Sequence, residues 1–545
     1  MTKKIKILFI LLIIVSFIAC VYMKKNSSKD LPDNIFLYNA LNDGNADARI
    51  GNTIKIIIDN IDNDKYYQEL DILNPYDGAI FPLDIASPRF TWRDQNPSST
   101  RWLVAIGFEN KHNMIYALTG KSQWTPDKNI WEVIKRNSIE KNVKIAVFGT
   151  NSEKAFEITS KSSIAISISP DRVGAPIFYK QVPPHFGYAY KHPEVSKWRL
   201  GDISSYGKPT IVLEKLPVCG NCHSFSRDGQ IFGMDIDYRN DKGAYVLTPT
   251  REKIELLDND FITWNDFPKK NGKINMGLFS KISPDGNYVV STVHEKNFMA
   301  LMNDLDFSQL FFTARGIIAY YSRSSQKFRP LPGADDPNYV QTSPAWSPDG
   351  NCVVFSRARV NKKLLELIEN YRPADISPNT RIEDLNAKYQ IQYDLYKVAF
   401  NHGKGGIPEA IKGASNNGMS NYCARYSPDG NWIVFNQSKT GLLLQPDSQL
   451  FIIPAEGGIA RKMICNKDIM NSWHSWSPNS RWLVFASKIN TPFTELFLTH
   501  INKNGNDSPP VLLSRLNSEK FAANIPEFIN LQKGVLKEIK LLDLN

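Results

Sequence analysis

Short apolar segments separated by turn residues recur along most of this chain and predict β-strands. In one of them Val104, Ile106 and Phe108 alternate with smaller residues. This alternation is typical of a strand that has one side in a core. Similar apolar segments occur at 89–92 and 143–148. The pattern therefore predicts an all-β protein.

The segments upstream of about residue 175 predict a separate domain. Trp92 and Trp131 are candidates for its core, and the spacing of its strands resembles that of a fibronectin type III or immunoglobulin-like module. Residues 71–175 contain no pair of cysteines, so only the looser type of β-sandwich fits. Residues 21–70 are rich in Asn, Asp and Lys and are expected to be a tether with one strand at Ile54–Ile58.

A five-residue turn recurs in the rest of the chain. In a typical copy Pro284 fixes φ at the second turn position, Asp285 bonds its own backbone, and Gly286 accepts a positive φ. An apolar strand follows each turn, as at Tyr288–Val290, so each copy predicts a β-hairpin. The copies begin at Phe225, Ile282, Trp346, Tyr426 and Trp476.

The repeated hairpins predict a ring of similar units. A second strand-like element recurs later in the repeats, and four strands per repeat is the composition of a β-propeller blade. We place the propeller at residues 176–530, with six blades favoured and seven as the alternative. Residues 362–371 predict a short amphipathic helix in an insertion. Residues 531–545 are expected to be a C-terminal tail.

Residues 1–20 predict a lipoprotein signal peptide. A basic start precedes an apolar run at Ile7–Ala19, and Cys20 follows directly. A small residue before a cysteine resembles a bacterial lipobox, in which Cys20 would carry the lipid, although Phe17 stands where Leu, Val or Ile is usual. The alternative is an uncleaved signal anchor, because the run is near the lower limit for a membrane span. Both alternatives export the rest of the chain.

The stretch from Cys219 to His223 reads C-x-x-C-H, the attachment signature of a c-type haem. In this interpretation Cys219 and Cys222 form thioethers with the porphyrin, and His223 binds the iron. Haem is attached outside the cytoplasm, which agrees with the predicted export. The alternatives are a redox-active or structural cysteine pair, or a partial metal site.

Alignment of the turns gives His223 a counterpart. His474 lies three residues before Ser477, as His223 lies three residues before Ser226. Equivalent positions on equivalent strands share an orientation, so we expect both imidazoles to face the same axial region, with His474 as a candidate distal ligand. The alternative is that His474 only forms a hydrogen bond within its blade. Further distal candidates are Met234, Met276 and His294.

Composition and motifs argue against several classes of function. The net charge is +10, but five lysines near the N-terminus supply half of it, and no block of like charges indicates nucleic-acid binding. No G-x-S-x-G occurs, and too few residues follow the last turn for a hydrolase domain. Asp285, Asp349 and Asp429 share one turn position, which predicts a structural role. We therefore expect no enzyme activity.

The Ser-Pro-Asp-Gly turns resemble the WD40-like repeats of the TolB family, periplasmic propellers of Gram-negative bacteria, over residues 220–510. Together with the predicted sandwich, the stretches at 222–226 and 471–478 resemble a family of bacterial lipoproteins, some of them described as cytochrome-c-like. The resemblance implies an outer-membrane lipoprotein that faces the periplasm or the cell surface. Two functions follow from it. One is electron transfer or redox sensing through one covalent haem, with a redox partner. The other is a non-enzymatic scaffold that binds an envelope protein or a glycan and has a structural or redox cysteine pair.

Overall fold

The computed structural model describes residues 35–39, 48–62, 64–109, 114–269, 272–372, 376–377, 379–532 and 534–542. The chain divides into two compact units, one ending at Pro170 and the other beginning at Asp171 and including Asp84–Ala86. The predicted signal peptide and Cys20 lie outside the described residues. Within the described ranges, no helix is long and apolar enough to cross a membrane.

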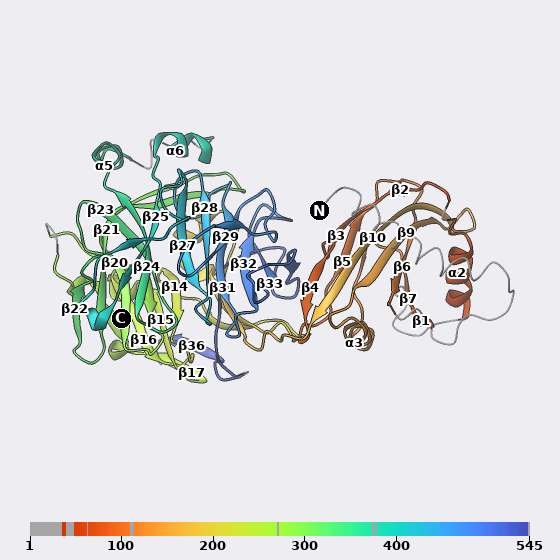
Figure 1. Ribbon diagram of the computed structural model, residues 1–545, viewed down its shortest axis with the longest axis horizontal. Coiled ribbons are helices and arrows are strands. Elements are labelled where there is room, and N and C mark those ends of the chain that lie inside the picture. Colours follow the sequence, from red (N-terminus) through yellow and green to blue (C-terminus); the bar gives the residue numbers. More distant parts are fainter. Residues whose placement is uncertain are drawn as a thin grey trace. The chain divides into compact units, whose positions relative to one another are not determined.

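In its described part, the first unit is built on a seven-stranded sheet and a three-stranded sheet (Figure 1). Two helices accompany them, α2 (Ala48–Asp59) and α3 (Lys128–Asn137). The strand order of the large sheet is β1 (Ile35–Asn39), β7 (Met114–Thr119), β6 (Arg101–Gly107), β9 (Val143–Asn151), β10 (Glu157–Ser169) and β2 (Gln68–Glu69), with β4 (Ala79–Pro82) also paired to β10. The order of the small sheet is β3 (Asp71–Asn74), β5 (Phe90–Arg93) and β8 (Gln123–Trp124).

Helix α2 packs on one side of the large sheet. Its Ile54 and Ile57 are buried beside Leu103 and Phe148. The expected strand at Ile54–Ile58 is therefore wrong, because isoleucines spaced three and four residues apart form one apolar helical stripe that covers the sheet.

Strand β6 of the large sheet is buried on both sides. Val104 of β6 is 0% exposed, and Ala105, which faces the other way, is 7% exposed. The expected half-buried strand is wrong here, because α2 covers the side that would otherwise meet water. Trp92 and Trp131 are buried as expected, and the ring of Trp131 packs edge-on against Phe81 with 5.5 Å between centroids.

Among its described residues, the second unit contains six groups of four antiparallel strands (Figure 1). In strand order they are β35 (Ala522–Phe528), β11 (Ile177–Val182), β12 (Lys197–Gly201) and β13 (Thr210–Glu214); β14 (Gly220–Phe225), β15 (Ile231–Ile236), β16 (Ala244–Pro249) and β18 (Phe261–Thr263); β19 (Leu278–Ile282), β20 (Tyr288–Leu301), β21 (Gln309–Ser322) and β22 (Lys327–Pro330); β23 (Tyr339–Trp346), β24 (Cys352–Arg359), β25 (Asp394–Ala399) and β26 (Glu409–Ala410); β27 (Ser420–Tyr426), β28 (Trp432–Ser438), β29 (Gln449–Pro454) and β30 (Arg461–Lys462); and β31 (Asn471–Trp476), β32 (Trp482–Ser487), β33 (Glu495–His500) and β34 (Val511–Leu512).

The first strands of these groups lie side by side in a closed succession. Along the series β14, β19, β23, β27, β31 and β35, each strand up to β31 contacts the one that follows it. The ring closes where Glu527 of β35 accepts a hydrogen bond from the backbone N–H of Phe225 of β14, at 3.2 Å. The C-terminal strand β35 also pairs with β11, near the beginning of this unit. This ring of four-stranded groups is a β-propeller, as the sequence predicts.

Apolar side chains fill the space between neighbouring groups. Val434 and Leu450 of the β27 group are buried against Leu483 and Phe485 of the β31 group. Because each group buries its two faces against its neighbours, the ring has a core only when it is complete.

The repeated turns are held by one set of hydrogen bonds. In the copy at Ser283, its hydroxyl donates to Asp285 at 2.5 Å and accepts from the N–H of Tyr288 at 2.9 Å, while Gly286 has a φ of 74°. In the next copy, the hydroxyl of Ser347 lowers the pKa of Asp349. The aspartates therefore have the structural role that the sequence predicts.

The end of the chain differs from the expected tail. Strand β36 (Glu538–Leu541) pairs in parallel with β17 (Lys253–Leu256). Ile539 of β36 is 3% exposed. Apolar residues at 539 and 541 give this segment a side that packs on the propeller, and a polar tail would lack it.

Candidate functional site

The C-x-x-C-H stretch lies on an extended strand. Cys219 immediately precedes β14, and its carbonyl accepts a hydrogen bond from the N–H of Asp237 at 2.9 Å. Cys222 and His223 belong to β14, which pairs with β15 through a bulge between Gly220 and His223. Residues three apart on a strand are separated by about 10 Å along the chain. The extended backbone therefore holds the two cysteines apart.

Cys222 and His223 face opposite sides of β14. Cys222 packs against an apolar cluster that includes Phe279 and Cys423. The imidazole of His223 is 0% exposed and packs edge-on against Phe178 of β11, with 4.6 Å between ring centroids. The backbone of Ile525 lies near the imidazole and acts to raise the pKa of His223.

Burial sets the protonation of both side chains. It lowers the pKa of His223 to about 4, although the nearby Glu527 acts in the opposite direction. It raises the pKa of the Cys222 thiol to about 12, with a further contribution from Asp235. Cys219 and Cys222 are both free thiols. At neutral pH the site thus holds a neutral imidazole and a protonated Cys222.

These residues do not fit a c-type haem. Attachment needs both thiols at one side of the porphyrin and the imidazole beneath its iron. Here the strand spreads the cysteines apart and sends His223 away from Cys222. The imidazole is also enclosed between β14 and Phe178, so it has no face open to a porphyrin. Among the described residues, no group of three or more His, Cys, Asp or Glu is arranged to hold a metal ion.

His474 takes the same place in its own group but does not meet His223. Its Nε2 lies 3.0 Å from the carbonyl oxygen of Val434 of β28, in the preceding group. His223 contacts Phe178 of β11, which is likewise the second strand of its preceding group. The expectation of a shared axial region is wrong, because side chains at this position enter the interface between two groups.

Of the other candidate distal ligands, only one lies next to His223. Met234 lies directly opposite His223 on β15 and is 0% exposed. Met276 is 38% exposed, and His294 Nε2 lies 2.7 Å from the carbonyl oxygen of Pro268. Met234 is therefore a packing neighbour of His223, and the other two have separate surroundings.

Residues at the bulges of the first strands form a cluster that was not expected from the sequence. Four of them, Cys222, Phe279, Cys423 and Trp473, pack in one cluster, and the hydroxyl of Ser343 lies 3.8 Å from Cys423 Sγ. Each lies four residues before the turn serine, a position that the repeat alignment identifies. Most have a positive φ, as at Phe279 (59°) and Cys423 (53°). The bulges turn these side chains toward the centre of the ring.

A charged network lies beside these bulges. Lys281 Nζ is 3.0 Å from Glu527 Oε2 and donates to the carbonyl of His223 at 2.9 Å. Burial raises the pKa of Asp235 to about 8, and Lys281 opposes this effect. The nearby lysine and the arginine Arg425 hold the pKa of Glu527 below its usual value against the effect of burial. Lys281 and Glu527 thus form an ion pair at the centre of the ring, next to a protonated Asp235.

One end of the ring carries all the repeated turns, and we call it the turn end. In the first copy of the turn, Arg227 stands where the later copies have proline. Its guanidinium donates to the carbonyls of Pro348 and Pro428, at 3.2 and 3.4 Å, in turns of two other groups. Its N–H donates to the carbonyl of Pro284 at 3.0 Å. Arg227 thus ties four turns together.

A long hairpin covers the opposite end, which we call the capped end. Strands β20 and β21 have 14 residues each, and the tip between them reaches other groups of the ring. Ser308 accepts a hydrogen bond from the N–H of Phe186 at 3.3 Å. Phe311 forms a β-bridge with Leu443. Lys488 Nζ lies 4.5 Å from the ring centre of Phe307.

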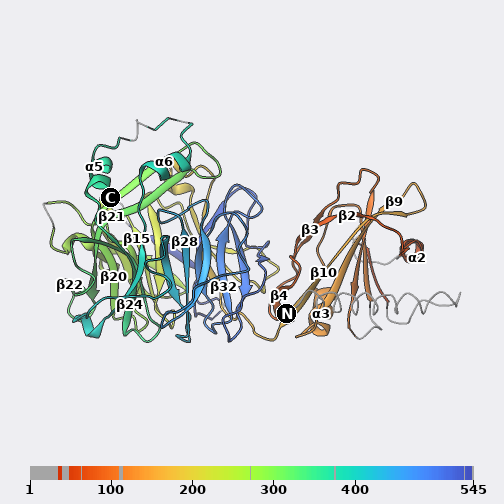
Figure 2. The same cartoon turned by 45° about the horizontal axis from the view of Figure 1, so that its top comes forward.

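The insertion after β24 adds to the cap. It forms α5 (Lys362–Glu369), which is the helix expected from the sequence, and α6 (Ile382–Lys388), which was not expected. Both lie at the same end of the second unit in Figures 1 and 2. Tyr389 stacks on Phe298 of the hairpin with 4.2 Å between centroids, and Asn386 donates to Gln445 at 2.7 Å. The insertion therefore braces the hairpin.

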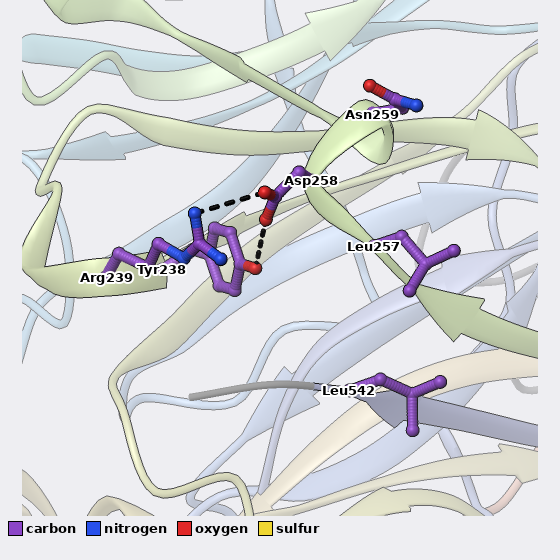
Figure 3. Close-up of a pocket in the computed structure, with 6 residues that line it drawn as sticks. All are labelled: Tyr238, Arg239, Leu257, Asp258, Asn259 and Leu542. Atoms are coloured by element: carbon purple, nitrogen blue, oxygen red, sulfur yellow. Dashed lines mark hydrogen bonds and ion pairs between the residues drawn. The ribbon is translucent and has the colours of Figure 1, made fainter. Parts of the chain in front are cut away.

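A surface pocket of ≈ 200 Å³ lies beside β17 (Figure 3). Asp258 accepts a hydrogen bond from Tyr238 at 2.5 Å and lies 3.1 Å from Arg239 Nη1. The charged groups of this pocket, Asp258 and Arg239, are thus already partnered with each other. Its lining residues are Tyr238, Arg239, Leu257, Asp258, Asn259 and Leu542.

Comparisons with known proteins give structural similarity only. No protein-family model matches the chain, and no curated protein matches it. A structure assigned as TolB from Agrobacterium tumefaciens is 14% identical, with 65% of this chain and 99% of that chain covered and a TM-score of 0.33. A periplasmic gluconolactonase from Pseudomonas aeruginosa is 11% identical, with coverages of 61% and 82% and a TM-score of 0.33.

An oligogalacturonate lyase in complex with manganese is 14% identical, with 62% of this chain and 72% of that chain covered and a TM-score of 0.34. Similarities at this level carry no argument about function. The assignment of a β-propeller rests on the strand order of this chain.

Proposed function

We propose that this chain is a non-enzymatic binding scaffold of the cell envelope that engages its partner through the capped end of the propeller. The observation that carries the proposal is the unequal construction of the two ends. The turn end repeats one five-residue turn, whereas the long hairpin, α5 and α6 all belong to the capped end. Binding residues are commonly placed on loops that a rigid scaffold holds.

The interior of the ring supports binding in place of catalysis. Near its centre, Lys281 forms an ion pair with Glu527. Asp235 and Cys222 are both held in their protonated forms by burial. A catalytic acid or base needs access to substrate, and the cap lies over this end of the ring.

We propose that the ring has six blades and that the first unit is an immunoglobulin-like sandwich.

The N-terminal sequence supports a place in the envelope. A basic and apolar segment directly before a cysteine, as at Cys20, is typical of an exported lipoprotein. We propose that lipid on Cys20 anchors the chain to the outer membrane, with the propeller in the periplasm or at the cell surface.

Site-specific photo-crosslinking in living cells tests the use of the capped end. A photoreactive amino acid is placed at Leu305 in the hairpin tip or at Leu367 in α5, both 40% exposed. The control position is Asn287 at the turn end, which is also exposed. Adducts from positions 305 and 367 but not from 287 are expected. Adducts from 287 alone, or from none of the three, would overturn the proposal.

A further inference from the structure

Two arginines at the capped end of β24 share one tyrosine ring. Arg357 and Arg359 are alternate residues of this strand, so their side chains leave it on the same side. The centre of the Tyr339 ring lies 3.6 Å from Arg357 Cζ and 5.4 Å from Arg359 Cζ. Tyr396, on the neighbouring strand β25, lies 4.7 Å from Arg357 Cζ. We call these four residues the arginine–tyrosine cluster.

The arginine–tyrosine cluster is open to water and faces away from the apolar part of the cap. Ala358, which lies between the two arginines, packs against the apolar cluster that includes Phe298 of the hairpin. Adjacent side chains of a strand face opposite ways, so Arg357 and Arg359 point to the other side. Arg359 is exposed, and Arg357 and both tyrosines are half-buried. A molecule from outside can therefore reach the cluster.

The acids on neighbouring segments do not neutralise these arginines. Asp335 and Asp336 lie in the loop before β23, and Asp394 lies directly opposite Arg357 on β25. Each of the three carboxylates accepts a hydrogen bond from a backbone N–H, at 3.1, 2.9 and 2.7 Å. Within the described part of the chain, neither Arg357 nor Arg359 forms an ion pair or a hydrogen bond.

Two polar atoms at this place lack partners among the described residues. They are the buried Nε of Arg357 and the Oε1 of Gln341, the residue opposite Arg357 on β23. Gln341 is 0% exposed, and its Nε2 donates to the carbonyl of Asp336 at 2.9 Å. A charged donor that is taken from water without an acceptor is costly. The fold thus holds the Arg357 guanidinium in place and leaves its hydrogen bonds unmade.

We propose that the arginine–tyrosine cluster binds a carboxylate in an acidic segment of a partner protein. This inference rests on the proposed function and names the chemistry of the partner. Arginine stacks on an aromatic ring with its flat face, which leaves the N–H groups in its plane free to form two parallel bonds with a carboxylate. The negative charge would also offset the repulsion between Arg357 and Arg359.

The composition of the cluster favours a protein as the occupant. Tyrosine and arginine are the residues that, with tryptophan, dominate the energetics of protein–protein interfaces. Because Tyr339 and Tyr396 already contact the guanidinium of Arg357, little side-chain freedom is lost when a carboxylate binds.

Fluorescence anisotropy with the full chain tests this proposal. Labelled octaglutamate is the acidic probe, and octaglutamine is its neutral match. Octaglutamate is expected to bind the wild type more tightly than octaglutamine does. Arg357→Gln is expected to weaken octaglutamate binding about tenfold. Arg357→Lys keeps the charge but loses the planar donor pair, so it is expected to weaken binding as well.

Two further variants separate the site from general attraction between a basic protein and a polyanion. Arg359→Gln changes an exposed side chain that the packing does not need, and is expected to weaken octaglutamate binding about threefold. Arg251→Gln removes an exposed arginine elsewhere in the propeller and is expected to leave binding unchanged.

Three results would overturn the proposal. One is equal binding of octaglutamate and octaglutamine by the wild type, and another is wild-type binding by the Arg357 variants. The third is tighter binding of an alginate oligosaccharide than of octaglutamate, lost in Arg357→Gln, which would make a sugar carboxylate the occupant. In each case crosslinks from positions 305 and 367 would still support the capped end as a binding surface.

Discussion

The imidazole of His223 packs edge-on against the ring of Phe178, 4.6 Å away, on the second strand of the preceding propeller group. This contact places the histidine of the C-x-x-C-H stretch in an interface between groups. Its neighbour Cys222 belongs to the cluster at the centre of the ring. The motif is therefore divided between two environments.

The first prediction concerns haem. Because β14 spreads Cys219 and Cys222 apart and buries His223, protein made in a host with haem-maturation machinery is expected to show no Soret band and no pyridine haemochrome. Intact-mass analysis is expected to give the mass of the chain without haem, and both thiols should react with iodoacetamide after unfolding. A covalent mass increment of one haem, lost in Cys219→Ala, contradicts this prediction.

The second prediction concerns acid stability. The pKa of His223 is lowered from 6.5 to about 4 by burial, so between these values the unfolded chain binds a proton that the folded chain does not. Stability is full above pH 6.5 and falls as pH decreases toward 4, by about 3 kcal/mol for this group. His223→Phe is expected to remove that part of the pH dependence.

Urea unfolding of the full chain at several pH values measures this effect. The exposed His192 provides a matched control, because His192→Phe changes a histidine in contact with water. An identical pH dependence in wild type and His223→Phe would show that His223 is not held neutral by the fold.

The third prediction concerns the turn end. Arg227→Ala removes the hydrogen bonds to Pro348 and Pro428, and is expected to lower the free energy of unfolding by about 1 kcal/mol, since the guanidinium is exposed to water. Arg251→Ala is the control, because this exposed arginine makes no hydrogen bond or ion pair among the described residues. Equal stability of the two variants by urea unfolding speaks against Arg227 as a tie between groups.

The fourth prediction concerns the cap. Phe307→Ala removes the ring under Lys488, an interaction worth about 1–2 kcal/mol at a partly buried site. Amide hydrogen exchange in residues 302–308 is expected to become about tenfold faster, while β31–β34 stay unchanged. Leu305→Ala, an exposed change in the same tip, should leave the exchange as in the wild type. Unchanged exchange in Phe307→Ala would mean that the tip is held by its other contacts.

The sequence predicted the propeller because its turns are local structures. Ser283, Asp285 and Gly286 complete one turn with bonds among residues at most five positions apart. The apolar residues of the strand after each turn then predict that each hairpin is buried. The same locality explains why α5 was predicted from a short segment rich in leucine and isoleucine, of which Leu364, Leu365 and Ile368 are buried.

Other features depended on the tertiary structure. Ile54–Ile58 became helical because a sheet elsewhere in the chain offered a surface to its isoleucine stripe. The cap was not visible in the sequence, since its contacts join the hairpin tip to residues such as Phe186 and Lys488, more than a hundred positions away. Contacts of this range leave no periodic pattern along the chain.

In the C-x-x-C-H stretch, the sequence determined which residues are present and the tertiary structure decided how they are arranged. The sequence alone determined that two thiols and an imidazole lie within five residues of one another. It also determined that the imidazole lies three positions before the serine of a repeated turn. Only the tertiary structure decided that the backbone there is extended and bulged, because pairing with β15 fixes its conformation. On a strand, adjacent side chains face opposite ways, so that pairing directs Cys222 toward the ring centre and His223 toward Phe178.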